Sequence, residues 1–475
     1  MGTFVGREED LGRLDRVLNG VRAGRATMLS VRGRRQVGKS RLVSEFVSRS
    51  GLPQLFVTGS RQASLAGDLE SFRQDALLNC TLPGADLLSA SAFPTWEQAL
   101  RTLAAALPSD TPSIVVLDEF PWLLEHDPGL DGTLQKLWDR RFESVPVLLI
   151  LVGSDVSVME LLTEHSRPLF GRARPLAVGP LSVRDSGRLA GLDLTSASDA
   201  ADALDGYLLT GGYPRLVAQW RAAGSTAHLI EDALADESTD LVATGQRVMD
   251  AEFPSDIQAT AVLRSIGAGE RSFSTIAARA GISATSLSRA LTTLQAKRVV
   301  TTDAPVSLRP APKLGRYRVA DPYLRFWLRF VEPGVADIRR GRPDLAVARV
   351  HRDWRTYRGR AVEPLVRDSL TRLAADDDAL GGAELIGGWW PRTNDPEVDL
   401  VGVTPSRSPT RVSFVGSIKW RDSAPFDDDD LRRLAVHRSH VPGAEASPLI
   451  AVSRSGSTAR PDALFGPVEL VAAWR

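Results

Sequence analysis

The sequence predicts an α/β protein of several domains, and three observations lead to this prediction. The chain has 475 residues, and because a domain usually has roughly 150, about three domains are expected. A glycine-containing loop at residues 33–40 lies between a predicted strand and a predicted helix. Further along, residues 251–332 have the pattern of short amphipathic helices, and residues 345–475 return to alternating helices and strands.

The composition is that of an ordinary globular protein, with 43% hydrophobic and 24% charged residues. Lys+Arg and Asp+Glu both number 58, so net charge gives no argument for nucleic-acid binding, although a local basic face stays open. Cys80 is the single cysteine, which excludes an intrachain disulfide and a cysteine-based zinc site. No apolar run approaches the ~20 residues of a membrane span. We therefore expect a cytoplasmic protein without a membrane partner.

Residues 33–40, GRRQVGKS, fit the phosphate-loop pattern G-x-x-x-x-G-K-[ST]. The apolar segment 27–31 is typical of a buried strand, and segment 40–46 has helical spacing. The glycines of such a loop let successive N–H groups and the helix N-terminus surround phosphates. Lys39 would neutralise the β- and γ-phosphates, and Ser40 would hold Mg²⁺. The sequence thus predicts ATP and Mg²⁺ as cofactors, with ATP held by Gly33, Arg34, Gln36, Val37, Gly38, Lys39, Ser40 and Arg41.

A second apolar run, at 113–117, ends in Asp118 and Glu119. An aspartate at the C-terminal end of a buried parallel strand lies at the top of the sheet, where it can position Mg²⁺. Glu119 is then placed to orient or deprotonate the attacking water. The pattern is weak by itself, but its pairing with the phosphate loop supports a catalytic carboxylate at Glu119 and a metal-associated one at Asp118.

A third apolar run, at 147–152, ends before Ser154 and Asp155. In additional-strand P-loop ATPases a polar residue at this place senses the γ-phosphate, whereas an ordinary strand-to-loop turn explains the pattern equally well. Arg172, in the segment PLFGR, is a candidate arginine finger for the transition-state charge, one of many arginines in the chain.

Five segments together resemble the archaeal-type P-loop ATPases, a prokaryotic family close to the AAA and STAND groups. They are FVGRE at 4–8, the phosphate loop, LDEFP at 117–121, GS at 153–154 and GGYP at 211–214. The resemblance implies an ATPase core at 1–180 and a helical lid at 181–250. It also implies that Gly6, Arg7 and Pro214 lie near ATP, although a plain interhelical turn also explains residues 211–214. In a ring of subunits Arg172 would act on a neighbour, and single subunits fit the residues equally well.

Residues 251–332 predict a winged helix-turn-helix. Segment 273–280 reads as a helix, Gly281 as a turn and Ser283 as the cap of a second helix over 284–297. Residues 299–318 would form the two-stranded wing. DNA binding would use Arg289 in the groove and, on phosphates, Lys297, Arg298 or Lys313. A module that packs only against protein explains the pattern equally well.

The aromatic segment 317–327 is more typical of a core or a domain interface than of a ligand site, and it also resembles the stretch that follows the winged helix in the same family. A linker is expected at 332–343, because this segment is rich in glycine, proline and arginine.

Residues 345–475 predict a helix near 359–366 and two strands, 397–403 and 411–420, joined by a turn at 405–409. The region resembles the core of PD-(D/E)xK nucleases, which the ATPase family often carries at its C-terminus. The resemblance implies a nuclease-like site of Glu363, Asp399 and Lys419. Ser417 stands where a second acid is needed, so affinity for a hard dication should fall, and Glu397 is the nearby substitute. A degenerate domain that binds DNA or a partner is favoured over an active nuclease.

The predicted architecture is an α/β multidomain chain, with an additional-strand P-loop NTPase core, a helical lid, a winged helix and a C-terminal α/β restriction-endonuclease-like domain. The leading function is a Mg²⁺-dependent ATPase that couples hydrolysis to a DNA-associated or regulatory switch. One alternative is an ATP-gated, metal-dependent DNA endonuclease, and another is a STAND-like signalling ATPase that binds only protein. The partners expected besides ATP are double-stranded DNA, a protein or a second copy of the chain.

Overall fold

The computed structural model describes residues 4–90, 92–253, 256–308, 314–404 and 411–474. The chain forms two compact units, Met1–Pro180 and Leu181–Arg475. Within these described ranges, no helix combines the length and the apolar character that crossing a membrane requires.

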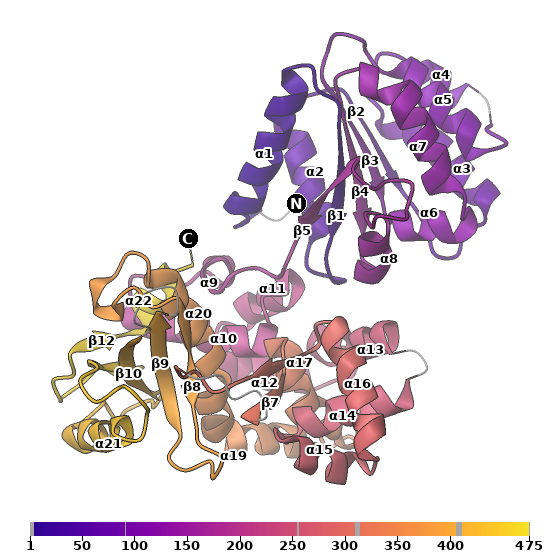
Figure 1. Ribbon diagram of the computed structural model, residues 1–475. Coiled ribbons are helices and arrows are strands. Elements are labelled where there is room, and N and C mark those ends of the chain that lie inside the picture. Colours follow the sequence, from indigo (N-terminus) through magenta and orange to yellow (C-terminus); the bar gives the residue numbers. More distant parts are fainter. Residues whose placement is uncertain (1–3, 91, 254–255, 309–313, 405–410, 475) are drawn as a thin grey trace. The chain divides into compact units, whose positions relative to one another are not determined.

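A parallel sheet of five strands forms the centre of the first unit, in the order β2-β3-β4-β1-β5 (Figure 1). The strands are β1 (Thr27–Arg32), β2 (Gln54–Thr58), β3 (Ser113–Asp118), β4 (Val147–Gly153) and β5 (Ala173–Ala177). β3 and β4 are buried along their whole length, which is why they read as continuous apolar runs rather than alternating ones. β4 lies between β1 and β3, so the unit has the additional strand that was predicted.

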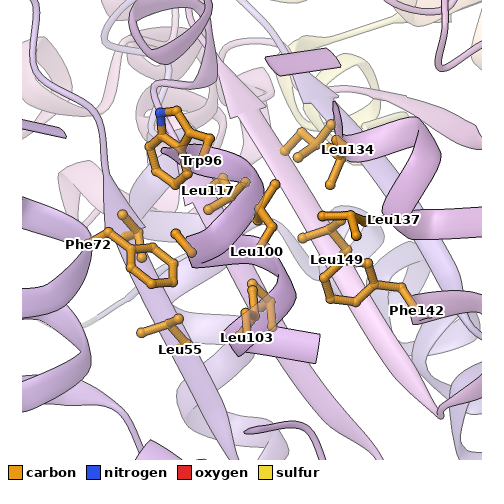
Figure 2. Packing of buried hydrophobic residues seen from close by; sticks show 14 of the residues in the cluster. Leu55, Phe72, Trp96, Leu100, Leu103, Leu117, Leu134, Leu137, Phe142 and Leu149 are labelled. Atoms are coloured by element: carbon orange, nitrogen blue, oxygen red, sulfur yellow. The ribbon is translucent and has the colours of Figure 1, made fainter. Parts of the chain in front are cut away.

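Helices cover both faces of this sheet (Figure 1). They are α1 (Glu8–Arg22), α2 (Lys39–Ser50), α3 (Leu65–Asn79), α4 (Ala85–Ser89), α5 (Trp96–Ala106), α6 (Phe120–His126), α7 (Leu130–Arg140), the 3₁₀ turn η1 (Phe142–Ser144) and α8 (Val156–Leu161). Figure 2 shows Phe72 of α3 and Trp96 of α5 in the same cluster as Leu117 and Leu149 of the sheet, and all four are buried. This apolar cluster holds the strand ends in place.

The second unit begins with helices and one small antiparallel sheet. These elements are α9 (Val183–Ala190), α10 (Ala197–Thr210), α11 (Pro214–Ala223), α12 (Thr226–Leu234), α13 (Asp240–Glu252), α14 (Ile257–Gly267), α15 (Phe273–Ala280), α16 (Ala284–Ala296), β6 (Val300–Asp303) and β7 (Arg316–Val319). Gly281 adopts a left-handed φ of 65°, and the Ser283 side chain caps α16. Helix, turn, helix and an antiparallel strand pair therefore occur where the sequence predicts them. Lys313 lies outside the described residues.

Four α-helices and one short π-helical turn follow β7 in the chain. They are α17 (Pro322–Phe326), the π-helical turn η3 (Trp327–Val331), α18 (Glu332–Arg339), α19 (Pro343–Ala361) and α20 (Glu363–Leu373). The linker prediction for 332–343 is wrong, because α18 covers most of that segment and only residues 340–342 connect it to α19. Pro333 and Pro343 lie in the first turn of their helices, where a missing N–H leaves no intrahelical hydrogen bond unmade.

The unit ends in a mixed sheet with the order β12-β11-β10-β9-β8. Its elements are the 3₁₀ turn η4 (Asp378–Leu380), β8 (Leu385–Trp389), β9 (Val398–Thr404), β10 (Arg411–Lys419), α21 (Asp428–Arg438), β11 (Leu449–Ser453), β12 (Ala463–Phe465) and α22 (Pro467–Ala472). β9 and β10 pair antiparallel, as predicted, while the predicted turn at 405–409 lies outside the described residues. Asp427 caps α21, and the acidic run 428–430 forms the first turn of this helix.

Helix α10, in the region predicted as a lid, shares one hydrophobic core with the C-terminal sheet. Its Leu204 and Leu208 belong to the same buried cluster as Ile418 and Ile450. At the polar side of this core Asp205 is 3% exposed. Its carboxylate accepts hydrogen bonds from Arg358 at 2.9 Å, Trp420 at 2.8 Å and Arg454 at 3.2 Å. The predicted regions 181–250, 251–332 and 345–475 thus lie in one compact unit, and their boundaries remain predictions.

Two sequence motifs meet inside this unit. The Tyr213 hydroxyl, in the GGYP segment, donates to Asp321 at 2.6 Å, and the other Asp321 oxygen caps α17 by accepting from the Leu324 N–H. Tyr323 packs against Gly211, where a Cβ would lie 2.8 Å from the Tyr323 side chain, so the position needs glycine. The aromatic segment 317–327 is therefore part of a packing interface, as expected.

Replacing Asp205 by alanine should lower the free energy of unfolding of the second unit by about 3 kcal/mol, because Arg358, Trp420 and Arg454 would lose a buried carboxylate, although Arg358 keeps Asp422 at 2.6 Å. Urea unfolding followed by tryptophan fluorescence measures this change. Asp202→Ala is the matched control, since Asp202 is on the same helix, is 51% exposed and also contacts Arg454. The control should cost under about 1 kcal/mol. Equal losses in the two variants would show that the buried network does not stabilise the unit.

Candidate functional site

The loop at residues 33–38 joins β1 to α2 in a tight, strained turn. Gly38 has φ 92° and Gln36 has φ 65°, a left-handed conformation that is unfavourable for a residue with a side chain. A Cβ on Gly33 would lie 2.1 Å from the backbone oxygen of Val178, just beyond β5. The first glycine of the pattern is therefore required by a close approach of two backbones.

Lys39 begins α2 and folds back over this loop. Its ammonium donates to the backbone oxygens of Gly33 at 2.8 Å and Arg34 at 2.9 Å, and the residue is 5% exposed. Burial lowers the pKa of Lys39 to about 8, while the charges of Glu119 and Asp118 act in the opposite direction. The ammonium is thus held by weak neutral acceptors that phosphate oxygens can replace.

Asp118 lies at the end of β3, is 4% exposed and accepts the Glu119 N–H at 3.0 Å. Burial raises the pKa of Asp118, and a hydrogen bond from the Ser40 side chain opposes this shift. The structure therefore brings Ser40 and Asp118 into contact. A hydroxyl and a carboxylate are hard oxygen donors, so these two residues fit Mg²⁺, which keeps most of its coordination positions for water and phosphate oxygens.

Glu119 precedes α6 with a left-handed φ of 51°, which turns its side chain away from the strand direction. Its carboxylate accepts a hydrogen bond from the Ser154 hydroxyl at 2.8 Å. Ser154 follows β4, the strand next to β3, and parallel neighbours end at the same edge. Asp155, the other candidate sensor, instead caps α8 by accepting the Val158 N–H at 3.0 Å.

Arg7 contacts the phosphate loop directly. It is 7% exposed and donates to the backbone oxygen of Val37 at 2.6 Å and to Asp10 at 3.0 Å. Gly6 and Arg7 both have left-handed φ values, 78° and 69°, which direct the chain into α1. The resemblance implied that these two residues lie beside the nucleotide; Arg7 contacts the predicted loop, and the role of both toward ATP stays a prediction.

Three further residues were predicted to act on ATP: Arg41, Arg172 and Pro214. Arg41 lies in the first turn of α2, is 47% exposed and lies 3.9 Å from Glu45. Arg172 forms a two-pronged ion pair with Asp139, at 2.7 and 2.8 Å. Pro214 begins α11 in the second unit. Their roles toward ATP stay predictions.

Trp122 is a residue of this edge that the sequence reasoning missed. The guanidinium groups of Arg35, in the phosphate loop, and Arg61, after β2, lie 5.4 and 5.3 Å from its ring centroid. These are cation–π distances. The sequence could have indicated Trp122, because this residue lies three positions after Glu119, on the helix α6 that follows β3.

The predicted nuclease-like residues are engaged with other groups. One Asp399 oxygen accepts both the Ser417 hydroxyl at 3.0 Å and the Ile418 N–H at 2.8 Å. The Lys419 ammonium lies 3.7 Å from Asp430. In the part of the chain that the structure describes, no three histidine, cysteine or acidic side chains are grouped to hold a metal ion. One oxygen of the Asp399 carboxylate thus accepts from two neutral donors, one of them the hydroxyl that stands in place of the second acid.

The two other acids of this region pair with arginines. Glu363 lies 3.0 Å from Arg367 and its side chain is 18% exposed, and Glu397 pairs with Arg316 at 2.5 Å. Burial raises the pKa of Glu363 to about 7, against the effect of Arg367. Arg316 thus holds Glu397. These contacts give no support to the expectation that Glu397 replaces the acid missing at position 417.

Since the pKa of Glu363 is raised from 4.5 to about 7, the folded protein keeps a proton that the unfolded chain releases in this window. The free energy of unfolding should therefore fall as pH rises from about 4.5 to 7. Glu363→Gln should lack this part of the fall. Urea midpoints measured across the window test this, with the exposed Glu445→Gln as control. Parallel pH profiles for Glu363→Gln and the wild type would contradict the assignment.

Comparisons with known proteins agree with the geometry of the first unit. Residues 3–150 match the family described as an AAA ATPase domain, and residues 327–433 match one described as archaeal and bacterial proteins of unknown function. An uncharacterized protein of Methanocaldococcus jannaschii is 24% identical over 449 residues, 93% of each chain.

Two solved structures of archaeal proteins are also similar. A Walker-type ATPase of Pyrococcus abyssi aligns with a TM-score of 0.49 and 18% identity over 69% of this chain and 96% of its own. The ORC2 protein of Aeropyrum pernix aligns with a TM-score of 0.47 and 18% identity over 70% of this chain and 94% of its own. The first unit is thus similar in sequence to AAA ATPase domains, and the chain continues into a region similar to archaeal and bacterial proteins whose function is unknown.

Proposed function

We propose that the protein binds Mg²⁺-ATP, hydrolyses it and couples the reaction to association of its second unit with DNA. One observation carries the hydrolysis proposal. Contacts at a single edge of the parallel sheet join Ser40 to Asp118 and Ser154 to Glu119, beside a phosphate loop closed by Lys39.

The residues at this edge have separate roles in phosphoryl transfer. Lys39 exchanges its two carbonyl acceptors for phosphate oxygens and neutralises their charge. Ser40 and Asp118 would hold Mg²⁺, which supplies further charge neutralisation at the phosphates when bound. Glu119 accepts the proton of the attacking water, and Ser154 holds the Glu119 carboxylate in position. Arg172 of a neighbouring subunit is the candidate finger, after release from Asp139.

Lys39→Ala should lower the rate of ATP hydrolysis by about 100-fold or more, because a preorganised charge at the phosphates is lost. Release of radiolabelled phosphate measures the rate. Lys136→Ala is the matched control, since Lys136 is an exposed lysine of the same unit, 41% exposed and paired with Glu97. Glu119→Gln separates ATP binding from hydrolysis. It should bind ATP as the wild type does, while its kcat falls by a factor similar to that of Lys39→Ala. Wild-type rates in Lys39→Ala would refute the assignment.

A role with DNA is supported by the outer face of α16. Leu287, Ala290, Leu291 and Leu294 are buried, whereas Arg289 is exposed. Residues 284–296 contain no acidic residue, and β6 and β7 stand beside the helix as a wing would. We therefore propose a winged helix that contacts DNA through α16, with protein-only binding as the alternative. We do not propose cleavage, because Ser417 replaces the second acid and the described residues contain no group of three side chains that could hold a metal ion.

Arg289→Ala should weaken binding of a fluorescent DNA duplex by about 10-fold, the effect of losing one groove or phosphate contact. Fluorescence anisotropy at two salt concentrations measures the affinity and its salt slope. Arg279→Ala on α15 is the control, being 53% exposed and 3.5 Å from Glu270.

Failure of the wild type to bind the duplex would favour the protein-only alternative. Incubation of the duplex with Mg²⁺ or Mn²⁺ should leave it intact. Cleavage that Asp399→Ala abolishes would reinstate the nuclease alternative.

A further inference from the structure

Two adjoining hollows in the second unit have no part in the roles above. The larger has a volume of about 280 Å³ and lies among α10, α17, α19 and α20. The smaller, of about 30 Å³, lies beside β7 and the start of α20. Both are lined by Arg318, Arg325 and Pro364, so they adjoin at these three residues.

The smaller hollow carries an excess of positive charge. Six arginines and three acids line it, which leaves three positive charges in excess: Arg271, Arg316, Arg318, Arg325, Arg360 and Arg367 against Asp303, Glu363 and Glu397. Each acid already has an arginine, since Asp303 pairs with Arg318, Glu363 with Arg367 and Glu397 with Arg316. In the described part of the chain, Arg325 and Arg360 form no ion pair. Arginine side chains without an acidic partner are typical of a site that binds a phosphate group.

The larger hollow ends in aromatic rings and an unsatisfied hydroxyl. The Tyr357 hydroxyl is buried and has no hydrogen-bond partner among the described residues. A buried hydroxyl without a partner is costly, so a ligand that supplies one is favoured. The Arg325 guanidinium lies 5.7 Å from the Tyr357 ring centroid, and Tyr207 and Trp474 also line the hollow. Arg325 thus links the cationic end to the aromatic end.

We infer that the linked hollows bind a phosphorylated nucleoside, with its phosphate among the arginines and its base and sugar beside Tyr357. A volume of about 280 Å³ is near the lower limit of pockets for small ligands, roughly 300 Å³. The smaller hollow has room for only about two waters, so the phosphate would lie where the two hollows adjoin, beside Arg318 and Arg325. The ligand is either the terminal nucleotide of a nucleic-acid strand or a free nucleotide. The inference is independent of ATP hydrolysis and rests on the proposed DNA role only for the two strand probes described below.

Isothermal titration of the full chain tests the site with three probes. They are a short thymidine oligonucleotide with a 5′-phosphate, the same strand with a 5′-hydroxyl, and thymidine monophosphate. Arg325→Gln, Arg360→Gln and Tyr357→Phe should each weaken binding of a phosphorylated probe, the arginine variants by about 10-fold or more, since each loses a charge-assisted hydrogen bond. Arg352→Gln, on α19 with Arg360 but 70% exposed and outside both hollows, should bind as the wild type does.

The probes separate the two sources of the ligand. Preference for the 5′-phosphorylated strand identifies a strand end, and binding of the monophosphate alone identifies a free nucleotide. Wild-type affinity for every probe in Arg325→Gln and Arg360→Gln would overturn the inference, as would equal affinity for both strands with no binding of the monophosphate. Because Arg360 is exposed, Arg360→Gln keeps the test valid if Arg325→Gln unfolds. ATP hydrolysis should be unchanged in these variants, so a failure here leaves the proposed ATPase intact.

Discussion

The order of three parallel strands, β3-β4-β1, is the constraint on which the candidate ATP site depends. Parallel neighbours end at the same edge, so Asp118, Ser154 and the phosphate loop are brought together by the sheet before any side chain interacts. The close approach of Gly33 to the Val178 carbonyl then fixes the loop against β5. Burial of β3 and β4 on both faces keeps this edge rigid. The chemistry of the first unit is thus a consequence of strand order.

Sequence reasoning succeeded where a pattern is local. The phosphate loop, the end of β3 and the capped turn at Gly281 and Ser283 each depend on residues within a few positions of one another, and each was predicted with its type and place. The linker at 332–343 failed because proline and glycine were read as breakers, although a proline in the first turn is compatible with a helix.

Long-range contacts could not be predicted, because their partners carry no common pattern. Asp205 and Arg358 are 153 residues apart, and neither is unusual in its own segment. The shared core of α10 and the C-terminal sheet, and the linked hollows beside it, arise from the same kind of convergence. The zero net charge of the chain also gave no sign of the arginine excess in the smaller hollow, because charge summed over a chain says nothing of its local distribution.

Lys419, which the resemblance assigned to a nuclease-like site, has an acidic partner in the structure. Only five of the 58 basic residues are lysines, so the compact ammonium at 419 is unusual in this chain and would suit a metal-assisted reaction. In the structure, Lys419 lies 3.7 Å from Asp430, and Arg421 binds the same carboxylate through two hydrogen bonds, at 2.8 and 3.0 Å. An ammonium shares this carboxylate with a guanidinium because it is small and carries its charge at one point. A buried acid with two cationic partners thus gives the lysine at 419 a structural role that needs no nuclease reaction.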